Sequence, residues 1–223
     1  MVHTDFANSI GNGILFLFVG PQVQLVTIHN ELMPEATRNY IREKNTGQAI
    51  YQLPDDDVSI VETYRLFLYT NKIFSIAAGN QEYPDDGVSE THADAEWTQL
   101  AHCYIFGITV KNERFANAAI SALIDKMTER DRYPTGIASE VYACTLRGDN
   151  LRRFIVDLHV YKGQGSWIRE PHGDADAPRE FVQDVINGLA VAGSSIYEED
   201  VQMPWVRGPC EYHEHTVTPR CGR

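Results

Sequence analysis

Four cysteine and histidine residues lie close together near the end of the sequence, in the pattern Cys210-x-x-His213-x-His215-x5-Cys221. Thiolate and imidazole groups are the preferred ligands of zinc, which they hold in a tetrahedron. Two histidines one residue apart on an extended chain point to the same side, so the flanking cysteines can fold over them. The pattern therefore predicts a structural zinc site formed by these four residues.

Two alternatives remain open for this segment. A tail that is disordered, or that simply packs on the protein, is compatible with the sequence. His-x-His is not the usual zinc-finger spacing, and Pro209 and Pro219 restrict how the chain closes. A catalytic zinc ion at His213 and His215, as in a small metal-dependent hydrolase, is the least expected, because four protein ligands leave no position for a substrate.

Other residues that could do chemistry have simpler structural interpretations. His29 could act as a general base, but no nucleophile or carboxylate lies at an interpretable spacing, so we expect a structural role. The run 55–57 of three aspartates precedes an amphipathic segment and should cap a helix. Cys103 and Cys144 fall in helical segments and are expected to be buried. We predict no catalytic residues and no organic cofactor.

Composition narrows the class of partner. The chain has 223 residues and a formal net charge of -12, which disfavours binding to nucleic acids and to anionic membranes. Arg147, Arg152 and Arg153 are the best candidates for a local basic patch. No apolar run is long enough for a signal peptide or a membrane span, so we expect a cytoplasmic or nuclear protein.

The elements that must position these residues are mixed α and β. Periodicity predicts strands over 14–19, 23–28 and 48–53, helices over 30–43 and 58–69, a polar loop over 77–95, and a helical hairpin over 97–127. Because the first strand is apolar at every position, we expect helices on both faces of the sheet.

The rest of the chain should be largely helical. Shorter helical pieces are predicted over 139–144 and 151–158, followed by a turn-rich segment over 163–177 and another helix that begins near Pro178. Little regular structure is expected after Gly193. The Cys/His pattern lies in this last part of the sequence.

Several motifs, in this order, resemble a BTB/POZ domain of the short type that is abundant in filamentous fungi. They are Ile28-His29-x-x-Leu32, Leu53-Pro54-Asp55-Asp56, Leu66-x-Leu68-Tyr69-Thr70-x-Lys72-Ile73, Leu100-x-x-x-Tyr104-x-Phe106-Gly107 and Ala118-Ala119-Ile120-x-x-Leu123. Val141-Tyr142, Leu151-Arg152-Arg153-Phe154-x-Val156-Asp157 and Cys210-x-x-His213-Glu214-His215 resemble the tail of such proteins. The resemblance implies a BTB/POZ-like domain over 9–130 and a helical extension with an irregular Cys/His-containing tail over 131–223.

The resemblance also implies that His29 is structural and bonds to the local backbone. It further implies protein binding and not catalysis. BTB domains self-associate, recruit cullin-type ubiquitin ligases as substrate adaptors, or bind transcriptional co-regulators. We therefore expect a scaffold or ubiquitin ligase adaptor whose partner is another protein, a cullin or a second copy of the chain. A transcription-associated regulator that acts through co-regulator proteins is the alternative. The exposed sides of the 94–127 hairpin and of the 30–43 helix are the expected partner surface.

Overall fold

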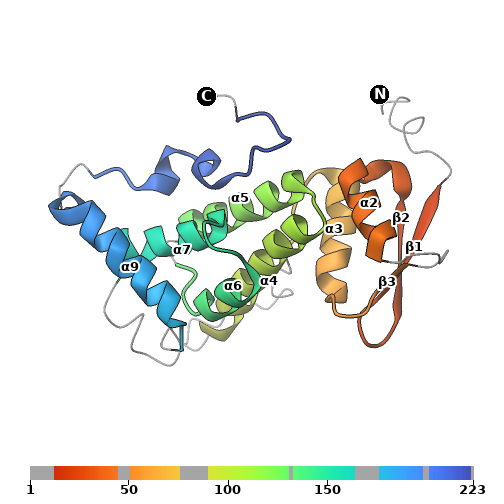
Figure 1. The fold of residues 1–223 in the computed structure, drawn as a ribbon, viewed down its shortest axis with the longest axis horizontal. Helices are drawn as coiled ribbons and strands as arrows, with labels where there is room; N and C mark the ends of the chain where they lie inside the picture. Colours follow the sequence, from red (N-terminus) through yellow and green to blue (C-terminus); the bar gives the residue numbers. More distant parts are fainter. Residues whose placement is uncertain are drawn as a thin grey trace.

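The structure is a computed structural model that describes residues 13–44, 51–75, 90–130, 133–163, 176–197 and 201–221. A small sheet lies at one end, helices fill the middle, and the C-terminal segment runs back along them (Figure 1). This architecture confirms the predicted mixed α and β class. No helix in the described part of the chain is both long enough and apolar enough to cross a membrane.

The sheet has three strands in the order β2-β1-β3. Strands β1 (Ile14–Val19) and β2 (Gln24–His29) form the predicted antiparallel hairpin, and Ile14 pairs with His29. Strand β3 (Tyr51–Leu53) runs parallel to β1 on its other side. The predicted third strand began at residue 48, but residues 45–50 lie outside the described part of the chain.

One face of the sheet is open in the described part of the chain, so the expectation of helices on both faces is wrong. Leu17, Val19 and their neighbours on β2 are buried beneath the helices, whereas Ile14 is 51%, Phe16 45% and Leu25 49% exposed. The run of β1 is apolar at every position, yet its burial alternates with the period of two that a strand imposes. Uniform apolarity thus reflects an apolar outer face that no described helix covers.

The helices next to the sheet begin and end at recognisable residues. The predicted 30–43 helix is divided into η1 (Asn30–Leu32) and α2 (Glu35–Lys44), because Met33 is extended where it precedes Pro34. Helix α3 (Val58–Thr70) is capped by Asp57, whose side chain accepts a hydrogen bond from the Ser59 amide at 2.7 Å. The aspartate run therefore caps a helix, as predicted.

Helices α4 (Glu90–Thr109) and α5 (Glu113–Arg130) form the predicted hairpin. They approach closely at Gly107, where an added Cβ would lie 2.7 Å from the backbone nitrogen of Ala116. The predicted loop over 77–95 is wrong for residues 90–95, which are helical; residues 76–89 lie outside the described part. The aromatic side chains of the hairpin are buried, namely Trp97, Tyr104, Phe106 and Phe115.

The extension adds α6 (Ala138–Cys144), α7 (Asn150–Tyr161) and α9 (Arg179–Ala192) to the same hydrophobic core. Three short 3-10 turns follow, η2 (Gly193–Tyr197), η3 (Pro204–Arg207) and η4 (Pro209–Tyr212). The helices confirm the predicted pieces to within a few residues. Of the predicted turn-rich segment, residues 164–175 lie outside the described part.

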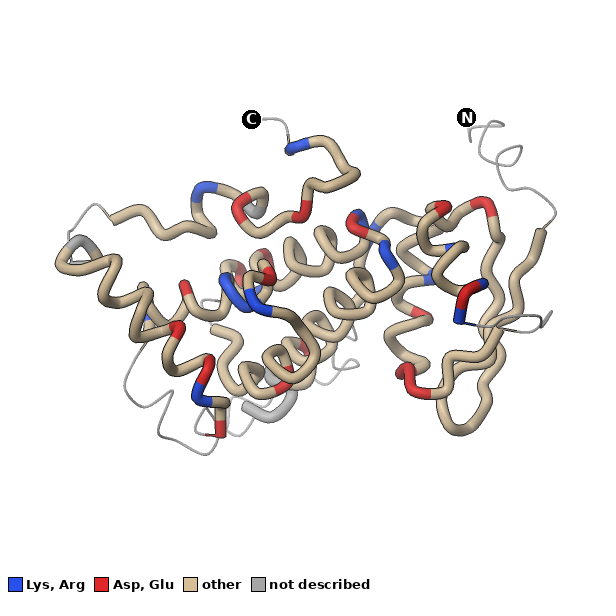
Figure 2. The backbone as a smooth tube through the Cα atoms, in the orientation of Figure 1, with Lys and Arg blue, Asp and Glu red and all other residues tan. Residues whose placement is uncertain are grey.

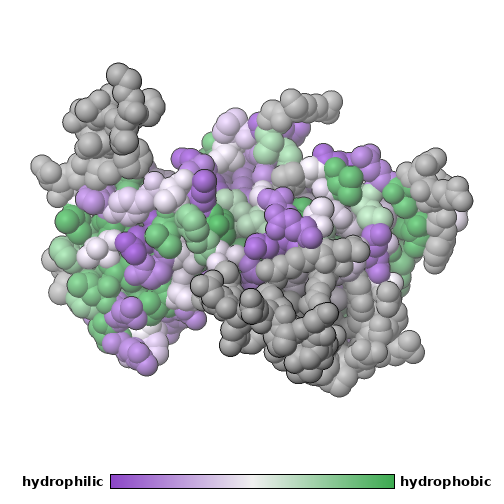
Figure 3. Space-filling model, turned by 180° about the vertical axis from the view of Figure 1, so that it is seen from behind, coloured by the Kyte–Doolittle hydropathy of each residue, from purple (hydrophilic) through white to green (hydrophobic). Residues whose placement is uncertain are grey.

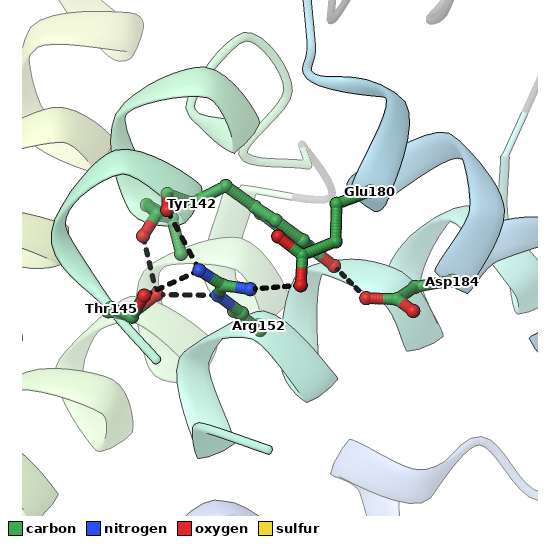
Figure 4. Close-up of polar contacts among 6 residues, drawn as sticks. Tyr142, Thr145, Arg152, Glu180 and Asp184 are labelled. Carbon is green, nitrogen blue, oxygen red and sulfur yellow. Dashed lines mark hydrogen bonds and ion pairs between the residues drawn. The ribbon is translucent and has the colours of Figure 1, made fainter. Parts of the chain in front are cut away.

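A buried arginine joins the three helices of the extension (Figure 4). The Arg152 guanidinium donates to the carbonyl oxygens of Tyr142 and Thr145, pairs with Glu180 at 3.1 Å, and stacks on the Tyr142 ring at 4.1 Å. The Tyr142 hydroxyl in turn donates to Asp184 at 2.8 Å. The proposed basic patch is therefore wrong at Arg152, since this side chain is 7% exposed and serves packing.

Candidate metal centre

The C-terminal segment is fixed to the helices by two large aromatic side chains. Trp205 in η3 packs edge-on against Tyr161, with ring centroids 6.2 Å apart. Tyr212 in η4 is fully buried against Phe154, with centroids 5.1 Å apart, and its hydroxyl donates to Asp157 at 2.8 Å. Between the two turns the chain reverses at Gly208, whose φ of 124° is a conformation that L side chains rarely adopt.

Polar side chains of α5 then hold the backbone of the tail. Asn117 accepts from the amide of Glu214 and donates to its carbonyl oxygen, both at 2.8 Å. One turn earlier, the Glu113 carboxylate accepts from three successive backbone amides, those of Thr216, Val217 and Thr218. These bonds fix the path of the chain between the two histidines and directly after the second one.

The hydrogen bonds from the tail stabilise the charged form of the Glu113 carboxylate. Burial by itself raises its pKa, but the hydrogen bonds from the Val217 and Thr218 amides outweigh burial and hold the pKa below its usual value of 4.5. The group is thus ionised at neutral pH, the state in which it accepts hydrogen bonds most strongly.

Along this path three of the four predicted ligands come together, and the fourth, His213, contacts only Cys221 among them. The ligand atoms of Cys210, His215 and Cys221 all lie within 4.8 Å of one another. His215 Nε2 is 3.2 Å from Cys210 Sγ, and His213 Nδ1 is 3.1 Å from Cys221 Sγ. Two nitrogen–sulfur pairs from one short segment therefore face each other.

The second nitrogen of His213 is also engaged. Its Nε2 lies 2.8 Å from the hydroxyl of Ser121 on α5, a contact that orients the ring and leaves Nδ1 directed at Cys221. Partial burial, and secondarily the nearby His215, lower the pKa of His213. Both effects favour the neutral imidazole, which is the form that binds metal ions.

The two sulfur–nitrogen contacts are close in length to the edges of a tetrahedral zinc site. Zn–S bonds of about 2.3 Å and Zn–N bonds of about 2.0 Å imply sulfur–nitrogen edges of about 3.6 Å. The two measured edges, 3.1 and 3.2 Å, differ from this value by only a few tenths of an ångström. A closed site of two thiolates and two imidazoles would require His213 to move toward the other three ligands, because it lies outside their group.

A cavity lies beside the tail but not at the cluster. It has a volume of about 440 Å³ and lies between α2, the α4–α5 turn and the tail. It is lined by Ala36, Gly107, Ile108, Lys111, Asn112, Glu113, Glu214, Thr216 and Val217. None of the four Cys/His residues is among these, so the cavity does not give a substrate access to them.

The other candidate residues do not join this centre. His29 Nδ1 lies 2.5 Å from the hydroxyl of Tyr69 on α3, so its partner is a side chain and not the local backbone. Cys103 is buried, and burial raises the pKa of its thiol to about 12, which makes it unreactive. Cys144 was expected to be buried but is exposed, because it ends α6 where the helix meets solvent.

Sequence reasoning missed the three α5 side chains that receive the tail, Glu113, Asn117 and Ser121. Asn117 offered a signal, since it lies among the alanines of a predicted buried face and a buried amide needs hydrogen-bond partners. Periodicity gave no indication that those partners would come from a segment about 97 residues later.

No protein-family model, curated protein or solved structure matches this chain. Its function therefore has to be inferred from its own residues.

Proposed function

We propose that this protein is a non-catalytic protein–protein interaction module of the BTB/POZ type, one that acts as a scaffold or as a substrate adaptor of cullin-type ubiquitin ligases. The order β1, β2, α2, β3, α3, α4, α5 supports this proposal, because it is the order of elements that the sequence resemblance implies. The sheet order β2-β1-β3 and the long α4–α5 hairpin are compatible with it.

One observation carries the interaction role: the outer face of the β1–β2 hairpin is apolar and exposed. Ile14, Phe16, Val23 and Leu25 are each 45% to 59% exposed, and Phe18 lies between Phe16 and Leu25 on the same face. Figure 3 shows hydrophobic residues gathered over this end of the molecule, which is at the left in that view. Exposed apolar patches of this kind mark sites where another protein binds.

The charge distribution supports the same face. Strands β1 and β2 contain no lysine, arginine, aspartate or glutamate, although the whole chain has a formal net charge of -12 (Figure 2). A partner can cover these strands without desolvating a charged side chain, which would be costly. Among the strands that the structure describes, β2 also lies at the edge of the sheet, so its outer backbone groups can pair with a strand of the partner.

The surfaces expected from the sequence are less suitable. Most described side chains of α4 and α5 are buried or half-buried, because α6, α7 and the tail pack on the hairpin. The exposed side of α2 is polar and charged, and includes Glu35, Asn39, Arg42, Glu43 and Lys44. The proposed partner surface is therefore the outer face of β1 and β2, which we call the sheet face.

A variant pair tests this role in cells that make the protein. Tagged full-length wild type and the double variant Phe16→Ser/Leu25→Thr would be purified by affinity, and retained proteins quantified by mass spectrometry. We expect a cullin, a co-regulator or an untagged copy of the chain to be retained by the wild type. We expect the double variant to retain it at least about tenfold less, since buried interface aromatics contribute most binding energy.

Leu146→Ser is the matched control, because Leu146 is 83% exposed on the α6–α7 loop, outside the sheet face. It should retain the same proteins as the wild type. A wild-type chain that is recovered as a monomer without partners would contradict the interaction role. Equal retention by the double variant would contradict its assignment to the sheet face.

A further inference from the structure

We propose that Cys210, His213, His215 and Cys221 bind one Zn²⁺ ion, and that this ion fixes the C-terminal segment onto α5 and α7. The proposal is independent of the interaction role, since the cluster and the sheet face lie in different parts of the molecule. It assigns to the protein a resident metal with a structural purpose.

The donor atoms of the four residues are those that zinc prefers. Two sulfur and two imidazole nitrogen atoms suit zinc and exclude the hard cations calcium and magnesium, which prefer oxygen ligands. Cys210, His215 and Cys221 already place their ligand atoms within 4.8 Å of one another, and His213, 3.1 Å from Cys221 Sγ, would complete the set by moving toward the other two. Each ligand comes from the segment 210–221, so a single local loop would close around the metal.

Neighbouring side chains hold His213 and Glu214 in place by hydrogen bonds. Metal-bound histidines commonly use their other ring nitrogen in a hydrogen bond that fixes the ring, and His213 does this with Ser121. Between the two histidines, Glu214 is held on both backbone groups by Asn117, and its carboxylate accepts from the Asn150 side chain at 2.8 Å. The side chain of Glu214 is thus turned to α7 while its neighbours face the cysteines.

The position of the cluster indicates what the ion would do. Outside the short turns η3 and η4, the tail has no helix or strand of its own to hold it together. It is attached to α5 through Glu113 and Asn117 and to α7 through Tyr212. A metal bridge between Cys210 and Cys221 would join the two ends of this attached stretch and so lower the entropy of its detached state.

Metal titration of the full chain tests the proposal. Protein stripped by a chelator under reducing conditions would be titrated with Zn²⁺ in competition with a chromophoric chelator, and separately with Co²⁺. We expect one ion per chain, and for Co²⁺ the absorption bands of a tetrahedral ion with thiolate charge transfer. Chelation should also make the segment 201–221 cleavable by protease while the helices remain resistant.

Variants identify the ligands. Cys210→Ser and His215→Gln should each weaken Zn²⁺ binding on the order of 100-fold or more, and Ser121→Ala by about tenfold through the orientation of His213. Cys144→Ser is the matched control, because Cys144 is an exposed free cysteine outside the cluster, and its affinity should equal that of the wild type.

Two results would overturn the proposal. Wild-type protein that binds less than one Zn²⁺ per chain, or whose Co²⁺ spectrum lacks thiolate charge transfer, would exclude the site without reference to any variant. A His213→Gln variant with unchanged affinity and an unchanged Co²⁺ spectrum would exclude the closed four-ligand centre. Neither result would bear on the binding of proteins at the sheet face.

Discussion

The N-terminal hairpin and the C-terminal tail differ in what they leave exposed to solvent. The N-terminal hairpin leaves an apolar face exposed, with Phe16 and Leu25 about half accessible to solvent. The C-terminal tail carries few regular elements, yet it is attached by specific polar contacts, among them the paired hydrogen bonds between Asn117 and Glu214. The hairpin therefore exposes apolar surface, whereas the tail is held by hydrogen bonds within the chain.

This difference separates a surface that can bind from a segment that is already bound. Covering apolar surface with a complementary protein lowers the free energy, so we expect a partner to bind the sheet face. The tail, in contrast, already contacts α5 and α7 of the same chain. Substitutions should therefore change folding stability at the tail and association at the sheet face.

The largest stability effect is expected at Tyr212. Tyr212→Ala would remove a fully buried ring from its contact with Phe154 and should lower the free energy of unfolding by about 3–5 kcal/mol. Tyr212→Phe keeps the ring and loses only the bond to Asp157, which should cost about 1 kcal/mol. Urea unfolding measures both. Equal effects of the two variants would show that the ring does not anchor the tail.

Arg152 should come next. Arg152→Ala would leave the carbonyl oxygens of Tyr142 and Thr145 without their donor and should cost about 2–3 kcal/mol. Arg153→Ala is the control, because Arg153 is exposed and only lies 5.3 Å from the Tyr212 ring. Thermal unfolding of both variants measures the two losses of stability. A loss at Arg153 as large as at Arg152 would contradict the assignment of the buried network to Arg152.

A smaller effect is expected at Glu113. Glu113→Gln keeps the shape but removes the charge that accepts the amides of Thr216, Val217 and Thr218, at a cost of about 1 kcal/mol. Since folding lowers the pKa of Glu113, its contribution is present above pH 4.5 and is lost as the pH falls through the lower folded value. Hydrogen exchange at residues 216–218 in the wild type should accelerate over that interval, and in Glu113→Gln it should lose this pH dependence.

The smallest stability effect is expected at the sheet face. Phe16→Ser should change the free energy of unfolding by less than about 1 kcal/mol, because the side chain is 45% exposed. Leu17→Ala, on the next residue but on the buried face, should cost about 2–5 kcal/mol. Chemical denaturation of the two variants measures the contrast. A severe loss in Phe16→Ser would mean that the outer face is part of the core.

Local patterns predicted most of the elements, because their causes are local. The alternation along β2, the aspartates before α3 and the periodic apolar residues of α4 and α5 each act within a few residues. The break of the predicted first helix at Pro34 is also local, and could have been read from the restriction that proline places on Met33.

Tertiary contacts could be predicted only in part. The four predicted ligands lie on one short segment, and three of them, Cys210, His215 and Cys221, lie close together in the structure, whereas His213 is outside that group. The attachment of that segment to Glu113 and Asn117 depends on contacts across about 100 residues, which no periodicity encodes. The open face of β1 was missed because apolar composition alone does not distinguish a strand buried on both faces from one with an exposed apolar face.

The most direct test of the account is hydrogen exchange on the purified full-length protein, alone and in complex with the partner that it retains. The account predicts that the partner slows exchange in residues 14–19 and 24–29 and leaves residues 210–221 unchanged. Slower exchange in the tail or along α4 and α5, with none in the two strands, would contradict it.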